Sequence, residues 1–281
     1  MEEYAQAKAL LFSQLGNVYQ TPHYPIAVLN RDDPTSARYE RNTAAQVLGY
    51  GIHEQAEIKA RIREVSAEGT YFDLQTPMGQ VDISLKMLGI HNVYNALAAI
   101  SALLPEGFTL EQIKAGIEGL KQVDGRFQSV SIPAPYTVIV DYAHTPDGLE
   151  NVLKSIKAFA KGKIYCIVGC GGNRDRSKRP IMAKIAWDLA DFSVFTSDNP
   201  RDEDPQIILD EMITGIPFQS GNKRYEVLVD RKEAIWWTLT RAEAHDIILI
   251  AGKGHETYQI IGKDILPFDD REVVSSYFDI K

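Results

Sequence analysis

The stretch TSDNPRDEDP, residues 196–205, follows the apolar run 192–195 and precedes a helical pattern over 206–213. A strand, a polar loop and a helix in this order make up one unit of an open α/β sheet. In such sheets ligands bind where the carboxyl ends of strands meet the amino ends of helices. The loop is therefore a candidate ligand site by its position.

The side chains of this loop sharpen that expectation. Asn199 offers both a donor and an acceptor, and Pro200 stiffens the turn. The planar guanidinium of Arg201 is suited to gripping a carboxylate with two hydrogen bonds. Turn chemistry alone also explains these residues, with Arg201 paired to its acidic neighbours Asp202 and Glu203. Both interpretations remain open at this point.

The second half of the chain continues the same alternation. We predict strands at 137–141, 163–168, 192–196, 225–229 and 247–251, helices at 148–160, 179–189, 206–213 and 231–241, then an edge hairpin at 258–266 and a closing helix at 270–278. This spacing predicts a Rossmann-like, doubly wound and mainly parallel sheet. Because the carboxyl ends of parallel strands share one edge, the polar loops that follow them should line one cleft.

The first half predicts a different sheet. We expect helices at 2–15, 35–46, 96–104 and 109–120, and strands at 25–30, 47–52, 58–65, 71–75 and 81–85. The last three strands are short and separated by glycine turns, which favours a small antiparallel sheet attached to a mixed α/β one. A linker at 121–125 then divides the chain into domains 1–124 and 125–281.

Composition restricts the class of protein. With 44% apolar and 24% charged residues, the chain has the composition of an ordinary globular protein. A net charge of -8 argues against nucleic-acid and acidic-membrane partners. Cys166 and Cys170 lie in a strand and loop context without a second pair, which favours reduced thiols over a zinc site. Neither a signal peptide nor a membrane-length apolar run is present, so we expect a cytoplasmic protein.

Two glycine-containing loops follow predicted strands. Residues 170–180 combine glycines, basic side chains and a helix start, which favours an anion site, although a flexible basic surface loop has the same composition. This loop lacks the G-x-G-x-x-G dinucleotide fingerprint. The Gly-Lys-Gly at 252–254 lacks the preceding glycine and the following Ser or Thr of a phosphate-binding P-loop.

Two polar groups have both a functional and an ordinary explanation. Asn92 and Asn95 lie three residues apart at a helix start, where their amides can hold a base edge or cap the helix. Asp141, Tyr142 and His144 follow a strand and are placed to serve a nucleotide. A turn-forming aspartate and a satisfied histidine explain the same residues equally well.

Taken together, these motifs resemble the Mur ligase family over essentially the whole chain. The resemblance rests on YAQAKALLF (4–12), LGIHNVYNALAA (88–99), GRFQSV (125–130), VIVDYAHTPDGLENVL (138–153), GCGGNRDRSKRPIMAKIA (169–186), SDNPRDEDP (197–205) and AGKGHETYQ (251–259). It implies an enzyme that uses ATP and magnesium to join an amino acid to UDP-muramoyl-dipeptide through an acyl-phosphate, in the cytoplasmic stage of peptidoglycan synthesis. Residues 1–124 would be the later part of the central ATP-binding domain, and 125–281 the carboxy-terminal domain.

The resemblance also implies residue roles. Lys8, which by itself is a snorkelling lysine on an apolar helix face, matches a lysine that these ligases carbamylate to support magnesium. Asn92 and Asn95 match positions near the adenine. The positions that face the nucleotide are matched by Arg126, Asp141, Tyr142 and His144.

By the same resemblance, the loop at 198–201 selects the incoming amino acid. Members of the family that take meso-diaminopimelate are similar here in having Asp198, Asn199, Pro200 and Arg201, whereas lysine users lack the arginine. Physical chemistry agrees, because diaminopimelate carries a second amino-acid head. We expect Arg201 and Arg174 to pair with the carboxylate of that head, and Asn199, Gly252 and Glu256 to hold the rest, with Glu256 taking the ammonium.

The chain departs from the family pattern at one point. Family members begin with a UDP-sugar-binding domain and a Gly-Lys-Ser/Thr phosphate loop, and neither occurs in these 281 residues. We therefore expect the chain alone to bind the amino acid without turnover, and its first sheet to expose an edge prone to association. The alternatives are a non-catalytic amino-acid-binding module derived from a Mur ligase and a relative of folylpolyglutamate synthetase.

Overall fold

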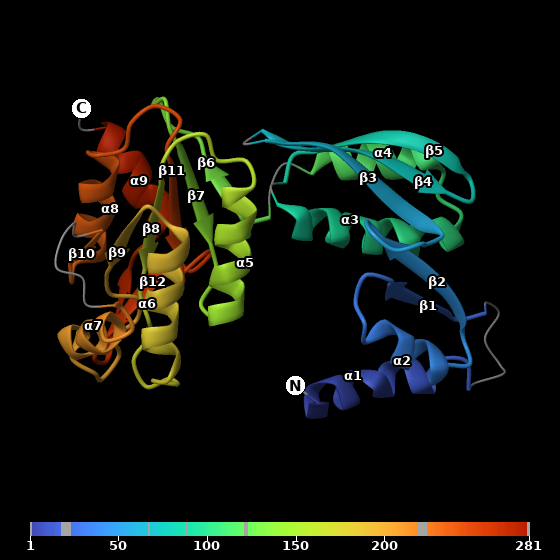
Figure 1. Ribbon diagram of the computed structural model, residues 1–281, viewed down its shortest axis with the longest axis horizontal. Helices are drawn as coiled ribbons and strands as arrows, with labels where there is room; N and C mark the ends of the chain where they lie inside the picture. The colour runs from blue at the N-terminus through green and yellow to red at the C-terminus, as the bar shows by residue number, and fades with distance from the viewer. Residues whose placement is uncertain are drawn as a thin grey trace. The chain divides into compact units, whose positions relative to one another are not determined.

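The computed structural model describes residues 2–17, 24–66, 68–87, 89–120, 123–217 and 224–279. The chain forms two compact units, Met1–Lys121 and Gln122–Lys281, which are considered one at a time (Figure 1). Among the described helices, none is both long enough and apolar enough to cross a membrane.

The N-terminal unit contains one mixed sheet. Its elements are α1 (Glu2–Gln14), β1 (Ile26–Asn30), α2 (Ser36–Arg41), β2 (Gln46–Gly51), β3 (Ile58–Ser66), β4 (Gly69–Thr76), β5 (Gly79–Leu85), α3 (Ile90–Leu103), the 3-10 turn η1 (Leu104–Glu106) and α4 (Leu110–Gly119). The described strands form a five-stranded sheet in the order β1-β2-β3-β4-β5. The first three strands run parallel and the last three antiparallel.

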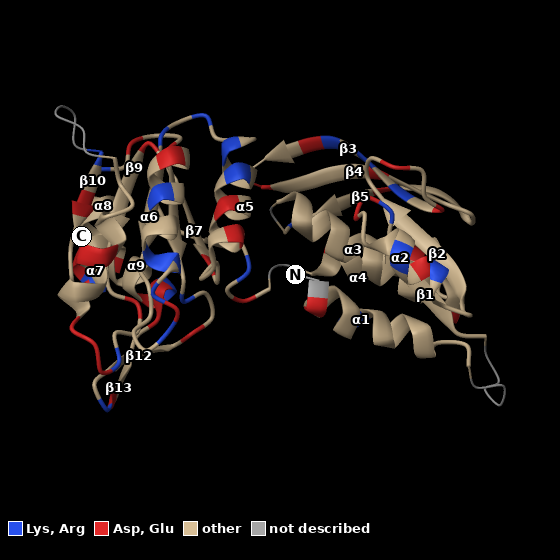
Figure 2. Cartoon of the chain, turned by 60° about the horizontal axis from the view of Figure 1, so that its bottom comes forward, with Lys and Arg blue, Asp and Glu red and all other residues tan. Residues whose placement is uncertain are grey.

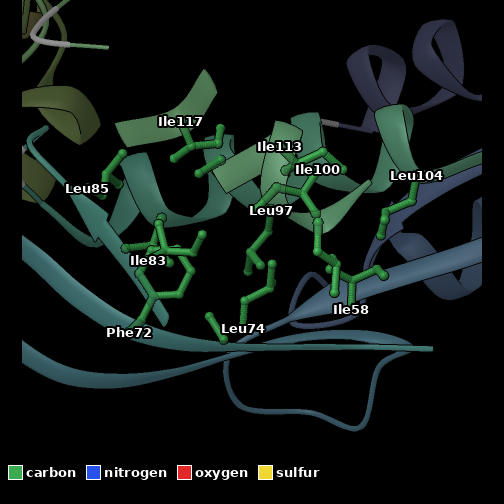
Figure 3. Close-up of a cluster of buried hydrophobic side chains, with 14 of the residues drawn as sticks. Ile58, Phe72, Leu74, Ile83, Leu85, Leu97, Ile100, Leu104, Ile113 and Ile117 are labelled. Carbon is green, nitrogen blue, oxygen red and sulfur yellow. The ribbon is translucent and has the colours of Figure 1, made fainter. Parts of the chain in front are cut away.

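The core of this unit lies between the strands β3 to β5 and the helices α3 and α4. Figure 3 shows the side chains of the strands and helices pointing toward one another, among them Phe72, Leu74, Leu97 and Ile113. Burial on β4 alternates with a period of two, as expected for a strand with one covered face. α4 begins in a capping box, in which Thr109 accepts from the Gln112 amide and Gln112 accepts from the Thr109 amide.

The antiparallel strands continue the parallel ones in a single mixed sheet, which agrees with the predicted attachment. Two predicted helix bounds in this unit are corrected. α2 ends at Arg41, well before the predicted residue 46, because Asn42 leaves the helical conformation and turns the chain toward β2. α3 begins at Ile90, so the predicted start at residue 96 was too late.

The C-terminal unit confirms the predicted doubly wound fold. Its elements are β6 (Gln128–Val130), β7 (Thr137–Asp141), α5 (Pro146–Lys157), β8 (Ile164–Val168), α6 (Lys178–Leu189), β9 (Phe192–Phe195), α7 (Pro205–Ile213), β10 (Tyr225–Val227), α8 (Arg231–Leu239), β11 (Ile247–Ala251), β12 (Tyr258–Ile261), β13 (Asp264–Pro267) and α9 (Asp270–Asp279). Within the described residues the main sheet has the order β10-β9-β8-β11-β7-β6. All its neighbours pair in parallel except β6 and β7.

The strand order positions the loops. β11 lies between β7 and β8, so the loops that follow these three strands lie side by side, and the loop after β9 lies next to that of β8. α5 and α6 cover one face of the sheet and α8 and α9 cover the other (Figure 1). Figure 2 shows charges of both signs along α5 and α6. Some of them form ion pairs one turn apart, Lys154 with Glu150 and Lys184 with Asp188.

Two elements of this unit differ from the sequence predictions. β6, a short antiparallel edge strand, was missed because its residues Gln128 and Ser129 have no strand-like alternation. The hairpin of β12 and β13 was expected at the sheet edge, but it forms its own two-stranded sheet. It contacts the loop after β9 instead, where the Arg201 amide donates to the Ile260 carbonyl at 3.0 Å.

Candidate functional site

A cavity of about 700 Å³ lies where the strands of the C-terminal unit end. We call it the strand-end cavity. Four loops, those after β7, β8, β9 and β11, contribute to its wall, as the strand order requires. The predicted site residues in the wall are Tyr142, His144, Arg174, Asp198, Asn199, Arg201, Gly252 and Glu256, joined by Lys178, Asp175 and Tyr258.

Arg201 is fixed in the wall by backbone contacts. Its φ of 52° is unusual for a residue with a side chain. Its Nη1 donates to the carbonyl oxygens of Gly172 at 2.9 Å and Asn199 at 3.3 Å. This approach requires glycine at 172, because a Cβ there would collide with the Pro200 carbonyl. The guanidinium is thus held at the cavity by neutral acceptors.

The acidic neighbours of Arg201 have other partners. Glu203 pairs with both terminal nitrogens of Arg179 at 2.9 Å, and Asp202 accepts from the side chain of Asn173 at 2.8 Å. The bond with Arg179 and the Asn173 amide lower the pKa of Glu203 to about 2. The interpretation of Arg201 as a turn residue paired to Asp202 and Glu203 is therefore wrong.

A buried polar cluster forms the floor of the cavity. Lys253 is 0% exposed. Its Nζ lies 3.0 Å from Asn199 Oδ1, 3.3 Å from Glu256 Oε2 and 3.5 Å from Asp198 Oδ1. Asn199 Nδ2 also donates to Glu256 Oε2 at 2.9 Å. The cluster joins the loop after β9 to the loop after β11.

The hairpin holds this cluster from the other side. Gln259 Nε2 donates to the Asp198 carbonyl at 2.8 Å, and the Ile260 amide donates to Asn199 Oδ1 at 3.0 Å. Asn199 Oδ1 thus accepts from both Lys253 and the hairpin backbone. These bonds give the side chain of Asn199 a defined orientation.

The basic loop after β8 has fewer groups available to bind an anion than its composition indicates. The amides of Gly172 and Asn173 donate to Asn199 O and to the Glu203 carboxylate, so they are occupied. Arg176 and the buried Arg179 pair with Glu211. The cavity therefore receives two of the four basic residues predicted there.

These two residues are Arg174 and Lys178. Lys178 Nζ donates to the His144 carbonyl at 2.7 Å. Arg174 is exposed, and the described part of the chain offers it no hydrogen-bond partner. Arg174 and Arg201 are therefore the two guanidinium groups that face the cavity.

The loop after β7 is held by Asp141. Its two carboxylate oxygens accept from the amides of Phe127 at 2.6 Å and Ala143 at 2.8 Å, as the turn interpretation expects. Burial raises the pKa of Asp141, and these two bonds offset part of that effect. Beside the turn, the Tyr142 ring lies 4.5 Å from the His144 ring and 5.4 Å from the Arg126 guanidinium.

Comparison with known proteins now identifies the family. The family model for the Mur ligase, glutamate ligase domain matches residues 125–254, and the model for the Mur ligase middle domain matches residues 1–103. The chain belongs to the Mur ligase family. The two matched regions fall within the C-terminal and N-terminal units respectively.

Curated relatives of this Mur ligase chain carry a more specific name. UDP-N-acetylmuramoyl-L-alanyl-D-glutamate--2,6-diaminopimelate ligase of Bacillus cereus is 55% identical over 97% of this chain, and that of Listeria monocytogenes serotype 4b is 49% identical over 96%. A solved structure with the same name has a TM-score of 0.67 at 36% identity, over 99% of this chain and 56% of that one. The chain spans about half the length of the curated relatives it matches, 55% in each case.

More distant structures share the fold. The folylpolyglutamate synthase of Thermotoga maritima has a TM-score of 0.66 at 18% identity, over 89% of this chain and 54% of that one. A likeness at this identity concerns the fold of a Mur ligase chain and not its substrate.

The other predicted residues of this Mur ligase lie in the N-terminal unit. Asn95 Nδ2 donates to Asn92 Oδ1 at 3.1 Å within α3. The helix begins after Gly89, which has no side chain to cap it. Lys8 is exposed on α1 with its Nζ 4.6 Å from the Tyr4 ring centroid, and the hydrogen bond with Tyr4 raises the pKa of Lys8.

The described residues do not by themselves form a phosphate and magnesium site for a nucleoside triphosphate. The sequence contains no Gly-Lys-Ser or Gly-Lys-Thr. No group of three or more His, Cys, Asp or Glu side chains suited to a metal ion occurs among the described residues. The amides of Gly172 and Asn173 in the loop after β8 already have protein acceptors. The described residues therefore lack a phosphate cradle of the P-loop kind.

The sequence did not lead us to predict Lys253 as a residue of the site. The Gly-Lys-Gly stretch was compared only with a phosphate loop, where a lysine faces the ligand. The structure turns this lysine inward, toward Asp198 and Asn199, more than fifty residues away in sequence. The one available signal was that the Gly-Lys-Gly stretch and the Asp-Asn at 198–199 both follow strands of the same predicted sheet.

Proposed function

We propose that this chain is the amino-acid-binding part of an ATP-dependent ligase that adds meso-2,6-diaminopimelate to UDP-N-acetylmuramoyl-L-alanyl-D-glutamate. The observation that carries the proposal is the strand-end cavity, with two guanidinium groups, Arg174 and Arg201, facing an acidic cluster that contains Asp198 and Glu256. This arrangement complements one carboxylate and one ammonium, which together form an amino-acid head. The names of the relatives at 49% to 55% identity support the choice of substrate.

The residues of the proposed site contact different groups of diaminopimelate. Arg201 forms paired hydrogen bonds with the distal carboxylate of diaminopimelate, and Arg174 adds a second cation. Glu256 accepts from the distal ammonium, and Asn199 and Gly252 fix the head beside it. The other amino group is then free to react with the activated muramoyl dipeptide. The chain thereby discriminates against L-lysine, which lacks the distal carboxylate.

The nucleotide part of the proposal rests on the family resemblance. ATP, when bound with magnesium in the longer protein, supplies the phosphoryl group that activates the acid. We assign contacts near the adenine to Asn92 and Asn95, and magnesium support to a carbamylated Lys8. Further contacts with the nucleotide are assigned to Arg126, Asp141, Tyr142 and His144. The partners are thus small molecules, and we place the reaction in the cytoplasm.

The test is a calorimetric titration of the 281-residue chain with meso-diaminopimelate and with L-lysine. Wild type should prefer meso-diaminopimelate. Arg201→Ala should lose about 2 to 5 kcal/mol of binding to meso-diaminopimelate, because a desolvated charge pair is broken. Its binding of L-lysine should change little, so the preference should disappear.

The matched control is Arg176→Ala. Arg176 comes from the loop after β8 but pairs with Glu211 on α7, outside the cavity wall. This variant should keep the wild-type preference. If Arg201→Ala keeps the preference for meso-diaminopimelate, the assignment of Arg201 to the distal carboxylate is wrong.

A further inference from the structure

Lys253 lies beneath the strand-end cavity, and its ammonium has an acceptor for each of its donors. An ammonium has three donors. The three acceptors within 3.5 Å of its Nζ are Asn199 Oδ1, Glu256 Oε2 and Asp198 Oδ1. Lys253 is 0% exposed and does not line the cavity. It therefore acts on a ligand only through the residues that it holds.

The first of these effects is on Asn199. The Oδ1 of Asn199 faces Lys253 and the Ile260 amide, and its Nδ2 faces Glu256. A flipped amide would direct its NH₂ at an ammonium and at a backbone N–H, both of which are donors. Lys253 thus sets which group of Asn199 faces the acidic side chain.

The second effect is on charge. Asp198 and Glu256 bring two negative charges, and Lys253 returns one positive charge. The Tyr258 ring lies 5.7 Å from Lys253 Nζ, and the buried pair of Arg231 and Asp270, which interacts electrostatically with Asp198 and Glu256, is neutral overall. The cluster is left with a single negative charge, which matches a single ligand ammonium.

We infer that Lys253 is a positioning residue that orients Asn199 and reduces the acidic cluster to one net negative charge, so that the cavity accepts one ammonium beside one carboxylate. This inference rests on the proposed function and names a determinant of its specificity. Without Lys253, the buried Asp198 and the partly buried Glu256 would adjoin each other without a cation between them. One of them should then take up a proton.

The test compares Lys253→Met with wild type at pH 6 and pH 8. In the variant, the proton is shared by the two carboxylates and competes with the ligand ammonium for Glu256, so meso-diaminopimelate should bind at least about tenfold more weakly than to wild type, with the larger loss at pH 6. The pH dependence of stability should be reversed, with the larger loss of stability at pH 8. The folded variant holds the proton at pH 6 and loses it as the pH rises, so its melting temperature relative to wild type should be lower at pH 8.

Two matched variants complete the design. Lys184→Met makes the same substitution at an exposed lysine on α6 and should match wild type in both measurements. Lys253→Met with Glu256→Gln removes one charge of each sign and should recover stability relative to Lys253→Met, even if the single variant folds poorly. Measuring wild type at both pH values is the control for contributions of His144, which lies in the cavity wall.

The outcomes separate the two proposals. A loss of affinity that is equal at pH 6 and pH 8 would overturn the inference, and so would a double variant no more stable than the single one. Either result would mean that Lys253 does not act by offsetting the charge of the acidic cluster. If wild type shows no preference for meso-diaminopimelate, the proposed function fails, and the stability comparison still decides the charge role of Lys253.

Discussion

The strand ends of the C-terminal unit and the first helix and strand of the N-terminal unit differ in how their side chains are supported. At the strand ends, the buried cations Lys253, Arg179 and Arg231 each have carboxylate partners. In the N-terminal unit, Leu10 and Leu11 of α1 are 59% and 65% exposed. β1, at the end of its described sheet, pairs with β2 alone.

This difference indicates which of the proposed site residues are held in position by contacts within their own unit. Asn199 and Arg201 are held by hydrogen bonds within their own unit, so the amino-acid site is preorganised. The ammonium of Lys8, in contrast, has the exposed Tyr4 ring as its described neighbour. The amino-acid site can therefore be tested in the chain as it stands, and the following predictions measure how unequal the two regions are.

The largest effect should come from the buried ion pair of Arg231 and Asp270, in which both side chains are 0% exposed. Arg231 also donates to the carbonyls of Ser197 and Ala251, at the ends of β9 and β11. Arg231→Met should lower the free energy of unfolding by about 3 to 5 kcal/mol, because Asp270 is left as an uncompensated buried charge.

Tryptophan fluorescence can follow this change during urea unfolding. All three tryptophans, Trp187, Trp236 and Trp237, lie in the C-terminal unit. The exposed pair of Lys184 and Asp188 provides the control, and Lys184→Met should cost less than about 1 kcal/mol. Equal effects of the two substitutions would contradict the view that the strand ends depend on buried charge pairs.

An intermediate effect is expected at Asp32, the best supported polar group of the N-terminal unit. Burial raises the pKa of Asp32, but bonds from the amides of Glu54, Ile52 and His53 and from the Tyr94 hydroxyl outweigh it and lower the pKa to about 2. The unfolded value is near 4, so this stabilisation is present above pH 4 and is lost as the pH falls toward 2. It amounts to about 2 kcal/mol.

Asp32→Asn should therefore destabilise the N-terminal unit by about 2 kcal/mol at pH 7, with the difference from wild type shrinking below pH 4. Urea unfolding followed by far-UV circular dichroism measures it, and tryptophan fluorescence should be unaffected. Asp73→Asn is the control, because Asp73 pairs with the exposed Arg63 on the sheet surface. A difference that persists at pH 2 would show that the carboxylate charge is not responsible.

The sequence predicted the doubly wound fold well because the inner strands are apolar runs with polar ends. The predicted strands at 137–141 and 247–251 have the bounds of β7 and β11. The loops after these strands were placed correctly for the same reason. The sequence predicted the helix α2 but placed its end too late, and it did not predict the edge strand β6, because these limits depend on neighbouring strands more than on local periodicity.

Within the candidate site, the residue types at the strand ends were predictable and their partners were not. Arg201 was singled out, but whether Glu203 would pair with Arg201 or with Arg179 depended on the approach of two loops thirty residues apart. Lys253 was overlooked because its acceptors belong to another strand end. Periodicity shows which loops converge, but tertiary packing decides which charges in them stay available.

The smallest effect should come from the exposed face of α1. Leu10→Gln and Leu11→Gln should each change the free energy of unfolding by less than about 0.5 kcal/mol, because both side chains are already largely in water. Leu97→Ala, in the core shown in Figure 3, should cost about 2 to 5 kcal/mol. Hydrogen exchange of peptides from α1 and α3 would compare the two directly.

The same two substitutions at Leu10 and Leu11 remove exposed apolar surface from the unit in which β1 is an edge strand of the described sheet. If that surface and edge attract a second copy, sedimentation velocity should show self-association of wild type that decreases in the double variant. A loss of more than about 1.5 kcal/mol in either single variant would instead mean that α1 packs as a core helix. In that case the contrast between the two regions would be smaller than the exposed fractions of Leu10 and Leu11 indicate.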